Sequence, residues 1–398
     1  MDGIGYMRRQ DSTLGGTRLR LFALILICAL VFPVFVFAGG SKEADAEGEE
    51  SSEGEITVTD ALGREVSLPE NPEHIICSGS GALRLVSYLE RQDRVVAVDD
   101  METRRPEFDA RPYALANPQF RNLPTFGEFR GHDNPERIVS LEPLPQVIFK
   151  TYPEMGMSPE ELERKTGVPV VALNYGDLFG YRDDFFRSLR TLGKVLEAEE
   201  RAEELVSFFE ESIADLSERT EGVPEEEKRS CYVGGIAFKG PHGLTSTEPA
   251  YPPFMFVEAR NVAYDPQKSL DELQHAHTSR ESIVKWDPEV LFVDVSTLQS
   301  DPQSSALYQL KNDPAYDDLT AVEEGEVYGV LPYNWYTRNF GSIIANAYFI
   351  GTVLYPDRFD DIEPAEKADE IYEFLVGAPV FEELNSAFDN LAYGRISH

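Results

Sequence analysis

The sequence predicts an α/β protein with two Rossmann-like lobes, each built on a mostly parallel sheet, joined by a single long helix. Short apolar runs alternate with amphipathic helical stretches from residue 56 onward. This alternation gives way to a purely helical block in the middle of the chain and then restarts. Apolar strands that alternate with helices are typical of parallel sheets covered on both faces. The 398 residues, 42% of them hydrophobic, suffice for two cores.

The first 38 residues fit neither lobe. Four arginines precede the uncharged run LFALILICALVFPVFVFA (21–38), which ends in small residues and is typical of an export signal. The run is also just long enough to span a membrane, so an uncleaved anchor is the alternative. Residues 39–55 are acidic and rich in Gly and Ser, which predicts a flexible tether. We therefore expect an exported protein, periplasmic or at the cell surface, either free or held by its N-terminal segment.

The first lobe is expected over residues 56–181. Gly79 and Gly81 fall between a strand and a helix, but Arg84 stands where a dinucleotide-binding loop needs its third glycine. We expect a tight turn there, with Ser80 capping the helix, rather than a nucleotide site. The predicted strands of this lobe are 74–78, 94–100, 145–149 and 169–175, and its predicted helices are 81–91 and 158–167.

A helical linker is expected over residues 182–220, followed by the second lobe over 221–398. Apolar residues recur at helical spacing in 182–196 and again in 199–219. The second of these helices would be about 32 Å long at 1.5 Å per residue, enough to bridge two lobes. In the second lobe, the strand–helix alternation is predicted to restart over residues 231–238, 252–260, 280–287, 290–295 and 326–332. Predicted helices at 340–355 and 364–376 finish the chain.

The composition and the motifs exclude several kinds of function. The formal net charge is −35, and such a surface repels nucleic acid, so no nucleic-acid partner is expected. Cys77 and Cys231 lie at strand edges in different halves, and we expect no disulfide between them. His275 and His277 could hold a metal, but the sequence shows no second histidine pair, so no direct metal site is expected. No motif for hydrolase, metalloprotease or phosphate chemistry is recognisable, which argues against an enzyme.

Loops that follow strands supply the candidate ligand-binding residues, because α/β clefts hold ligands at the carboxyl ends of their strands. The loop LPYNWYTRNFG (331–341) suits a bulky, partly aromatic ligand through stacking and cation–π contact. A buried aromatic cluster is the alternative for this loop. The candidates are Tyr333, Trp335, Tyr336 and Arg338 in this loop, Lys239, His242 and Tyr251 in residues 238–254, and Arg104, Arg105, Arg130 and Tyr152 in the first lobe.

Two short segments, NPERIVSLEP and SRESIVKWDP, place a glutamate at the start of a predicted helix. Glu136 precedes Pro143 by the same seven residues that separate Glu281 from Pro288. A single glutamate there has an ordinary explanation, because the helix dipole stabilises a carboxylate in the first turn. Two at matched positions of matched lobes form a paired negative feature that a two-subunit partner with basic sockets could bind.

Five segments together resemble the periplasmic binding proteins that deliver ferric siderophores, haem or cobalamin to ABC importers. They are residues 56–100, NPERIVSLEP, LRTLGKVLEAEERAEELVSFFE, EARNVAYD and SRESIVKWDPEVLFV. The resemblance implies two lobes held by a rigid helix, with the ligand in the cleft between them. It also implies that Glu136 and Glu281 each dock on arginines of one membrane subunit.

The resemblance further implies a monomeric, non-enzymatic binding protein without a cofactor of its own, with a metal chelate as ligand and a membrane permease dimer as partner. An iron(III) siderophore is the first expectation, and cobalamin or haem is the alternative. An anionic chelate would need the arginines, whereas a corrin would rely mainly on Trp335 and the tyrosines. A chelatase-like metal-handling enzyme shares the two-lobed architecture. The export signal and the missing catalytic motif argue against that reading.

Overall fold

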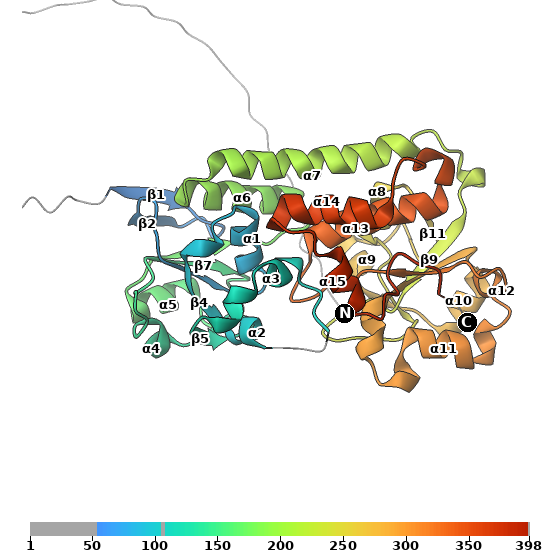
Figure 1. The fold of residues 1–398 in the computed structure, drawn as a ribbon, viewed down its shortest axis with the longest axis horizontal. Coiled ribbons are helices and arrows are strands. Elements are labelled where there is room, and N and C mark those ends of the chain that lie inside the picture. Colours follow the sequence, from blue (N-terminus) through green and yellow to red (C-terminus); the bar gives the residue numbers. More distant parts are fainter. Residues whose placement is uncertain (1–53, 105–107, 397–398) are drawn as a thin grey trace, which may run out of the picture. The chain divides into compact units, whose positions relative to one another are not determined.

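The computed structural model describes residues 54–104 and 108–396, which belong to one compact unit within residues 52–398 (Figure 1). The predicted export segment and residues 39–53 of the predicted tether lie outside the described residues. Glu55, the last residue assigned to the tether, opens the first strand. In the described part of the chain, no helix combines the length and the apolar character needed to cross a bilayer.

The first lobe is built on a six-stranded sheet with strand order β6-β5-β4-β3-β7-β8. All neighbouring strands are parallel except β6, which runs antiparallel to β5. The strands are β3 (Ile75–Ser78), β4 (Val95–Asp99), β5 (Thr125–Glu128), β6 (His132–Asp133), β7 (Val147–Thr151) and β8 (Val170–Leu173). The helices are α1 (Ala82–Tyr88), α2 (Asp100–Thr103), α3 (Pro112–Ala116), α4 (Pro135–Ile138) and α5 (Pro159–Thr166).

Strands β3, β7 and β8 are buried along their whole length, as expected for apolar strands covered on both faces. An antiparallel hairpin of β1 (Glu55–Thr59) and β2 (Glu65–Pro69) precedes the sheet and pairs only with itself. Its alternating exposed and buried residues place one face against the core.

Helices α6 (Arg182–Val195) and α7 (Glu199–Thr220) follow the first lobe in sequence, and the longer of them, α7, bridges the two lobes. The long helix α7 packs on α6 and also on α8 (Pro252–Phe256) and α13 (Phe340–Leu354) of the second lobe, as Figure 1 shows. Phe208 of α7 stacks on Phe374 of α14 (Pro364–Val376) with ring centres 4.4 Å apart. The predicted bridging helix is therefore confirmed, and it ends within a residue of its predicted boundary.

The second lobe is built on a four-stranded, fully parallel sheet with order β11-β9-β13-β14. Its strands are β9 (Ser230–Gly234), β11 (Arg260–Asn261), β13 (Val290–Asp294) and β14 (Val327–Val330), and a separate short pair joins β10 (Ser246–Thr247) to β12 (Ala276–His277). The remaining helices are α9 (Leu270–Gln274), α10 (Arg280–Trp286), α11 (Ala306–Asn312), α12 (Thr320–Glu323) and α15 (Phe381–Ser386).

The turn between β3 and α1 corrects one expectation. The cap of α1 is Gly81, in a left-handed conformation and without a side-chain cap bond, so Ser80 lies one residue too early to cap the helix. A Cβ atom added at Gly81 would lie 2.4 Å from the Tyr175 ring and 2.7 Å from the Thr337 methyl group. The glycine is therefore needed both for its conformation and for the close approach of two other segments.

Cys77 and Cys231 are both free and buried, each in a strand of a different lobe. The expectation that they form no disulfide is confirmed. Burial raises the pKa of both thiols.

Candidate ligand site between the lobes

The loop that follows β14, residues 331–339, crosses to the first lobe and is fastened there by Arg84. This arginine is fully buried in α1. Its guanidinium donates hydrogen bonds to the carbonyl oxygens of Arg338 at 2.8 Å, Trp335 at 3.3 Å and Tyr336 at 3.4 Å. The backbone is left-handed at Tyr336 and Thr337, with φ of 49° and 66°, where the loop turns. One buried cation therefore holds the whole tip of the loop.

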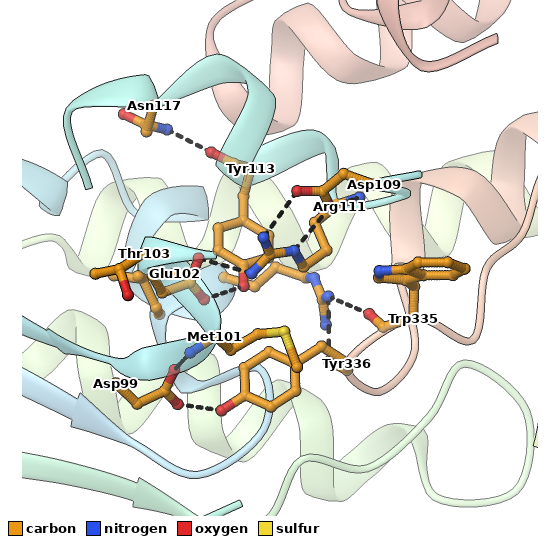
Figure 2. Close-up of polar contacts among 12 residues, drawn as sticks. Asp99, Met101, Glu102, Thr103, Asp109, Arg111, Tyr113, Asn117, Trp335 and Tyr336 are labelled. Carbon is orange, nitrogen blue, oxygen red and sulfur yellow. Dashed lines mark hydrogen bonds and ion pairs between the residues drawn. The ribbon is translucent and has the colours of Figure 1, made fainter. Parts of the chain in front are cut away.

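Tyr336 enters the first lobe and ends on Asp99, as Figure 2 shows. Its hydroxyl donates to the Asp99 carboxylate, which also accepts the Met101 amide at 3.0 Å. Burial, followed by the nearby Glu102 carboxylate, raises the pKa of Asp99 to about 7. Burial and the charge of Asp99 raise the pKa of Tyr336 as well. The hydrogen bond between Tyr336 and Asp99 therefore fixes loop 331–339 to the first lobe and is called the Tyr336 anchor below.

A buried network supports the Tyr336 anchor from α2 and α3 (Figure 2). Arg111, only 1% exposed, pairs with Glu102 and with Asp109 at 2.8 Å each. The Tyr113 hydroxyl donates to the second oxygen of Glu102 at 2.5 Å. Each buried charge therefore has a partner, as burial requires.

Tyr152 and Tyr175 form a second contact between the loop and the first lobe. The Tyr152 hydroxyl is hydrogen bonded to Thr337 Oγ1 at 2.6 Å, and the Tyr175 hydroxyl donates to the Arg338 carbonyl at 2.6 Å. The two tyrosine rings stack with centres 5.9 Å apart. Together with Arg84, these side chains join the two lobes across their facing edges.

Two cavities that share part of their lining lie beside this contact, one of about 390 Å³ and one of about 230 Å³. Both are lined by Tyr152 of the first lobe and by Gln274 and Arg338 of the second. Arg338 donates to Gln274 Oε1 at 3.1 Å. Volumes of a few hundred Å³ are typical of small-molecule sites. The arrangement offers hydroxyl, amide and guanidinium donors to a ligand held between the lobes.

The larger cavity also contains a buried acid, Glu248, which is 3% exposed. Burial raises the pKa of Glu248 well above its ordinary value, while the charge of Arg338 acts in the opposite direction. The carboxyl group therefore takes up a proton more readily than an exposed glutamate does. A protonated Glu248 would not repel an anionic ligand.

The structure brings three of the predicted ligand residues to the cavities, namely Tyr152, Tyr333 and Arg338. Trp335 packs edge-on against Phe388 at 6.0 Å instead. Tyr251 is fully buried and accepts a hydrogen bond from Asn346 Nδ2 at 3.2 Å. Tyr251 therefore lies in the protein interior, whereas Trp335 and Tyr336 are half-buried and contact protein groups instead of lining the two cavities.

Four further candidates, all within the described residues, line neither cavity. Arg104 pairs with Asp100 at 2.5 Å, and Arg130 and Lys239 are exposed, each beside a phenylalanine. His242 Nε2 is hydrogen bonded to the Phe238 carbonyl at 2.8 Å. Arg105 lies outside the described residues.

Several residues of the site escaped the sequence analysis, among them Arg84, Glu248 and Gln274. Arg84 was noticed only as the residue that breaks a glycine pattern, although a charged side chain in the apolar segment ALRLVSY is itself a signal of a special role. Glu248 follows the two-residue buried strand β10 and Gln274 ends the short helix α9, and neither belongs to a motif, so the sequence offered no comparable signal for them.

The two paired glutamates occupy matching positions. Glu136 is exposed in the first turn of α4, and the Glu281 side chain is 76% exposed in the first turn of α10. Two residues after each glutamate, Ile138 and Ile283 are fully buried. A surface hollow of about 1240 Å³ lies beside Glu136, on a part of the first lobe that shares no lining residue with the interlobe cavities. The paired surface and the cavities are therefore separate features.

Two α/β lobes linked by one long helix, with polar and aromatic cavities between them, define a two-lobed solute-binding protein. Residues 75–333 match the family model described as periplasmic binding protein. The chain belongs to the periplasmic binding protein family.

Among curated relatives, the chain is 20% identical over 339 residues to the uncharacterized ABC transporter substrate-binding lipoprotein YvrC of Bacillus subtilis, covering 84% of this chain and 97% of YvrC. It is 22% identical over 328 residues to the petrobactin-binding protein YclQ of the same organism, covering 81% and 95%. A crystal structure of a periplasmic solute binding protein from Veillonella parvula is similar, with a TM-score of 0.66, 20% identity and coverage of 85% and 98%. Each of these three proteins is named for substrate or solute binding.

Proposed function

We propose that this chain is the exported substrate-binding protein of an ABC importer, and that its ligand is an iron(III)-siderophore-type chelate. The observation that carries the ligand class is the position of Arg338, which borders both interlobe cavities. Ferric siderophore chelates with acidic arms are anionic and polar, and a guanidinium beside tyrosine hydroxyls matches such a ligand.

The geometry of the interlobe site also favours a siderophore over a corrinoid or haem. A corrinoid or haem offers a broad apolar face that calls for stacked aromatic rings. Trp335 and Tyr336 are committed to Phe388 and Asp99, and so do not supply that face. The relative YclQ, whose name states petrobactin binding, supports a siderophore independently of the cavity.

The proposal includes delivery to a membrane permease through Glu136 and Glu281. Their exposure at matched helix starts of the two lobes supports a contact with two basic sites of a dimeric partner. Because the glutamates lie apart from the cavities, ligand capture and docking are separable functions that different variants can test.

The ligand is tested with the purified chain from residue 39 onward, which contains the whole compact unit. Its melting temperature is measured with ferric catecholates, ferric hydroxamates, haem and cobalamin. A chelate at hundredfold excess over its dissociation constant stabilises the folded state by about 2.7 kcal/mol. We expect the ferric chelates to raise the melting temperature and Arg338→Ala to reduce that shift.

Arg130→Ala removes an exposed arginine outside the cavities and is the matched control, with no expected loss of ligand binding. If only haem or cobalamin raised the melting temperature, the ligand would belong to that alternative class and not to the siderophores. No shift with any of the four ligand classes would contradict a chelate-binding function.

A further inference from the structure

Three histidines from two separate segments of the chain, His242 and the pair His275 and His277, come together beside the larger interlobe cavity. The short pairing of β10 with β12 sets Ser246 opposite His277 and brings the loop that carries His242 next to residues 275–277. The imidazole ring centres are 5.1 Å apart for His275 and His277, 5.2 Å for His242 and His277, and 6.3 Å for His242 and His275. The sequence showed the 275–277 pair but gave no sign of the third ring.

The two spacings that involve His277 match those of a metal-bound histidine set, and the spacing between His242 and His275 is wider, at 6.3 Å. Three imidazoles bound tetrahedrally through metal–nitrogen bonds of about 2.0–2.1 Å have ring centres roughly 5 Å apart. As the rings are turned here, no group of three or more His, Cys, Asp or Glu side chains within residues 54–104 and 108–396 meets the requirements of a metal site. A histidine ring rotates about its Cβ–Cγ bond, whose line passes near the ring centre. The rotation changes which nitrogen faces inward and leaves the centres almost in place.

Two of the rings have a nitrogen suited to a metal. The hydrogen bond between His242 Nε2 and the Phe238 carbonyl fixes that nitrogen as the donor and leaves Nδ1 with its lone pair. A ligating histidine commonly donates its other N–H to a backbone carbonyl in this way. His275 Nδ1 is buried and has no hydrogen-bond partner within the described residues. His277 is exposed and free to turn.

We propose that His242, His275 and His277 form a binding site for one first-row divalent cation of the zinc, nickel or copper class. Neutral imidazole suits these ions, and three histidines leave the fourth tetrahedral position to water or a small ligand. His275 also lines the cavity of about 390 Å³, so the ion is held at the wall of that cavity. This site is independent of the proposed chelate, because the chain itself supplies the ligands to the metal.

The test is calorimetric titration of zinc chloride into the chain from residue 39 onward, without any chelate present. We expect one ion per chain with a dissociation constant on the order of micromolar. His275→Ala and His277→Ala should each weaken binding by roughly tenfold or more. Cobalt(II) should give the visible absorption of a tetrahedral ion in the wild type and lose it in both variants.

The matched control is His132→Ala, which removes an exposed histidine in the first lobe and should leave zinc binding unchanged. Far-ultraviolet circular dichroism and metal-free melting confirm that each variant is folded. Absence of stoichiometric zinc binding by the wild type would overturn the site, as would equal affinity in a variant that lacks all three histidines. Neither result bears on chelate binding, which is measured separately by the melting shifts.

Discussion

Asp294 ends β13 as a fully buried acid at the carboxyl edge of the second sheet. One carboxylate oxygen accepts the Ser296 amide at 2.9 Å, and the other has no hydrogen-bond partner among the described residues. Burial raises the pKa of Asp294 to about 7. In the unfolded chain an aspartate titrates near pH 4, so the folded state binds the extra proton between about pH 4 and 7.

This linkage makes Asp294→Asn a prediction with a definite sign. A raised carboxyl pKa favours the folded state at low pH, and the contribution is lost as pH rises through that window. Up to about pH 7, the wild type should therefore lose roughly 1.4 kcal/mol of unfolding free energy per pH unit relative to the variant, and no more above that pH. Urea denaturation at pH 5, 6, 7 and 8 measures the difference.

The control for that measurement is Asp318→Asn, which makes the same substitution at an exposed aspartate of the same lobe. A constant difference between the wild type and Asp294→Asn across the four pH values would contradict the assignment. At the residue scale the sequence predicted the strand that carries Asp294. Its burial depends on neighbours from distant segments, which no local pattern reveals.

The loop 331–339 acts as an element that fastens one lobe to the other. We predict that Arg84→Met frees its tip, because the methionine fills the buried space but donates no hydrogen bond to the three carbonyls. Hydrogen bonds from a charged donor contribute about 1.5–3 kcal/mol each. Amide hydrogen exchange across residues 334–339 should therefore accelerate by at least about tenfold.

The chain offers a close control in Arg91, whose guanidinium donates to the carbonyls of Leu196 and Glu197 instead. Arg91→Met should leave exchange in residues 334–339 as it is in the wild type. Unchanged exchange in Arg84→Met would mean that the aromatic contacts of the loop, rather than the guanidinium, hold it in place.

The sequence predicted those helices and strands whose signal lies within one short stretch of residues. The apolar runs of β3, β4, β7, β8 and β13 and the helical spacing of α6 and α7 identified these elements. The short strands β5 and β6 escaped notice because they are few in residues and partly polar. The direction of loop 331–339 was also beyond prediction, since its aromatic residues suit a ligand and a protein interior equally well.

The molecule as a whole carries the same surface feature once on each lobe, which leads to a prediction about transport. Replacing both glutamates, Glu136→Ala with Glu281→Ala, should abolish uptake in cells that depend on this protein. Ligand affinity should stay at the wild-type value, because neither side chain lines an interlobe cavity. If each glutamate contributes part of the docking contact, each single variant should retain partial uptake.

The control pair is Glu73→Ala with Glu382→Ala, which removes one exposed glutamate from each lobe at unrelated positions. This pair has the same charge change and should transport normally. Loss of ligand affinity in the Glu136 and Glu281 pair would place them in ligand binding and contradict docking. At this scale the repeat of the strand–helix rhythm was enough to predict two lobes and a bridge, whereas the ligand depends on side chains that meet only in the folded protein.

The two buried thiols, Cys77 and Cys231, divide evenly between the lobes. An oxidising compartment outside the cell would cross-link or modify accessible thiols. Both are shielded, and burial keeps both in the protonated, unreactive form. A thiol-specific label should therefore reach Cys77 or Cys231 only when the lobe that contains it opens, and the two labelling rates would report the opening of each lobe separately.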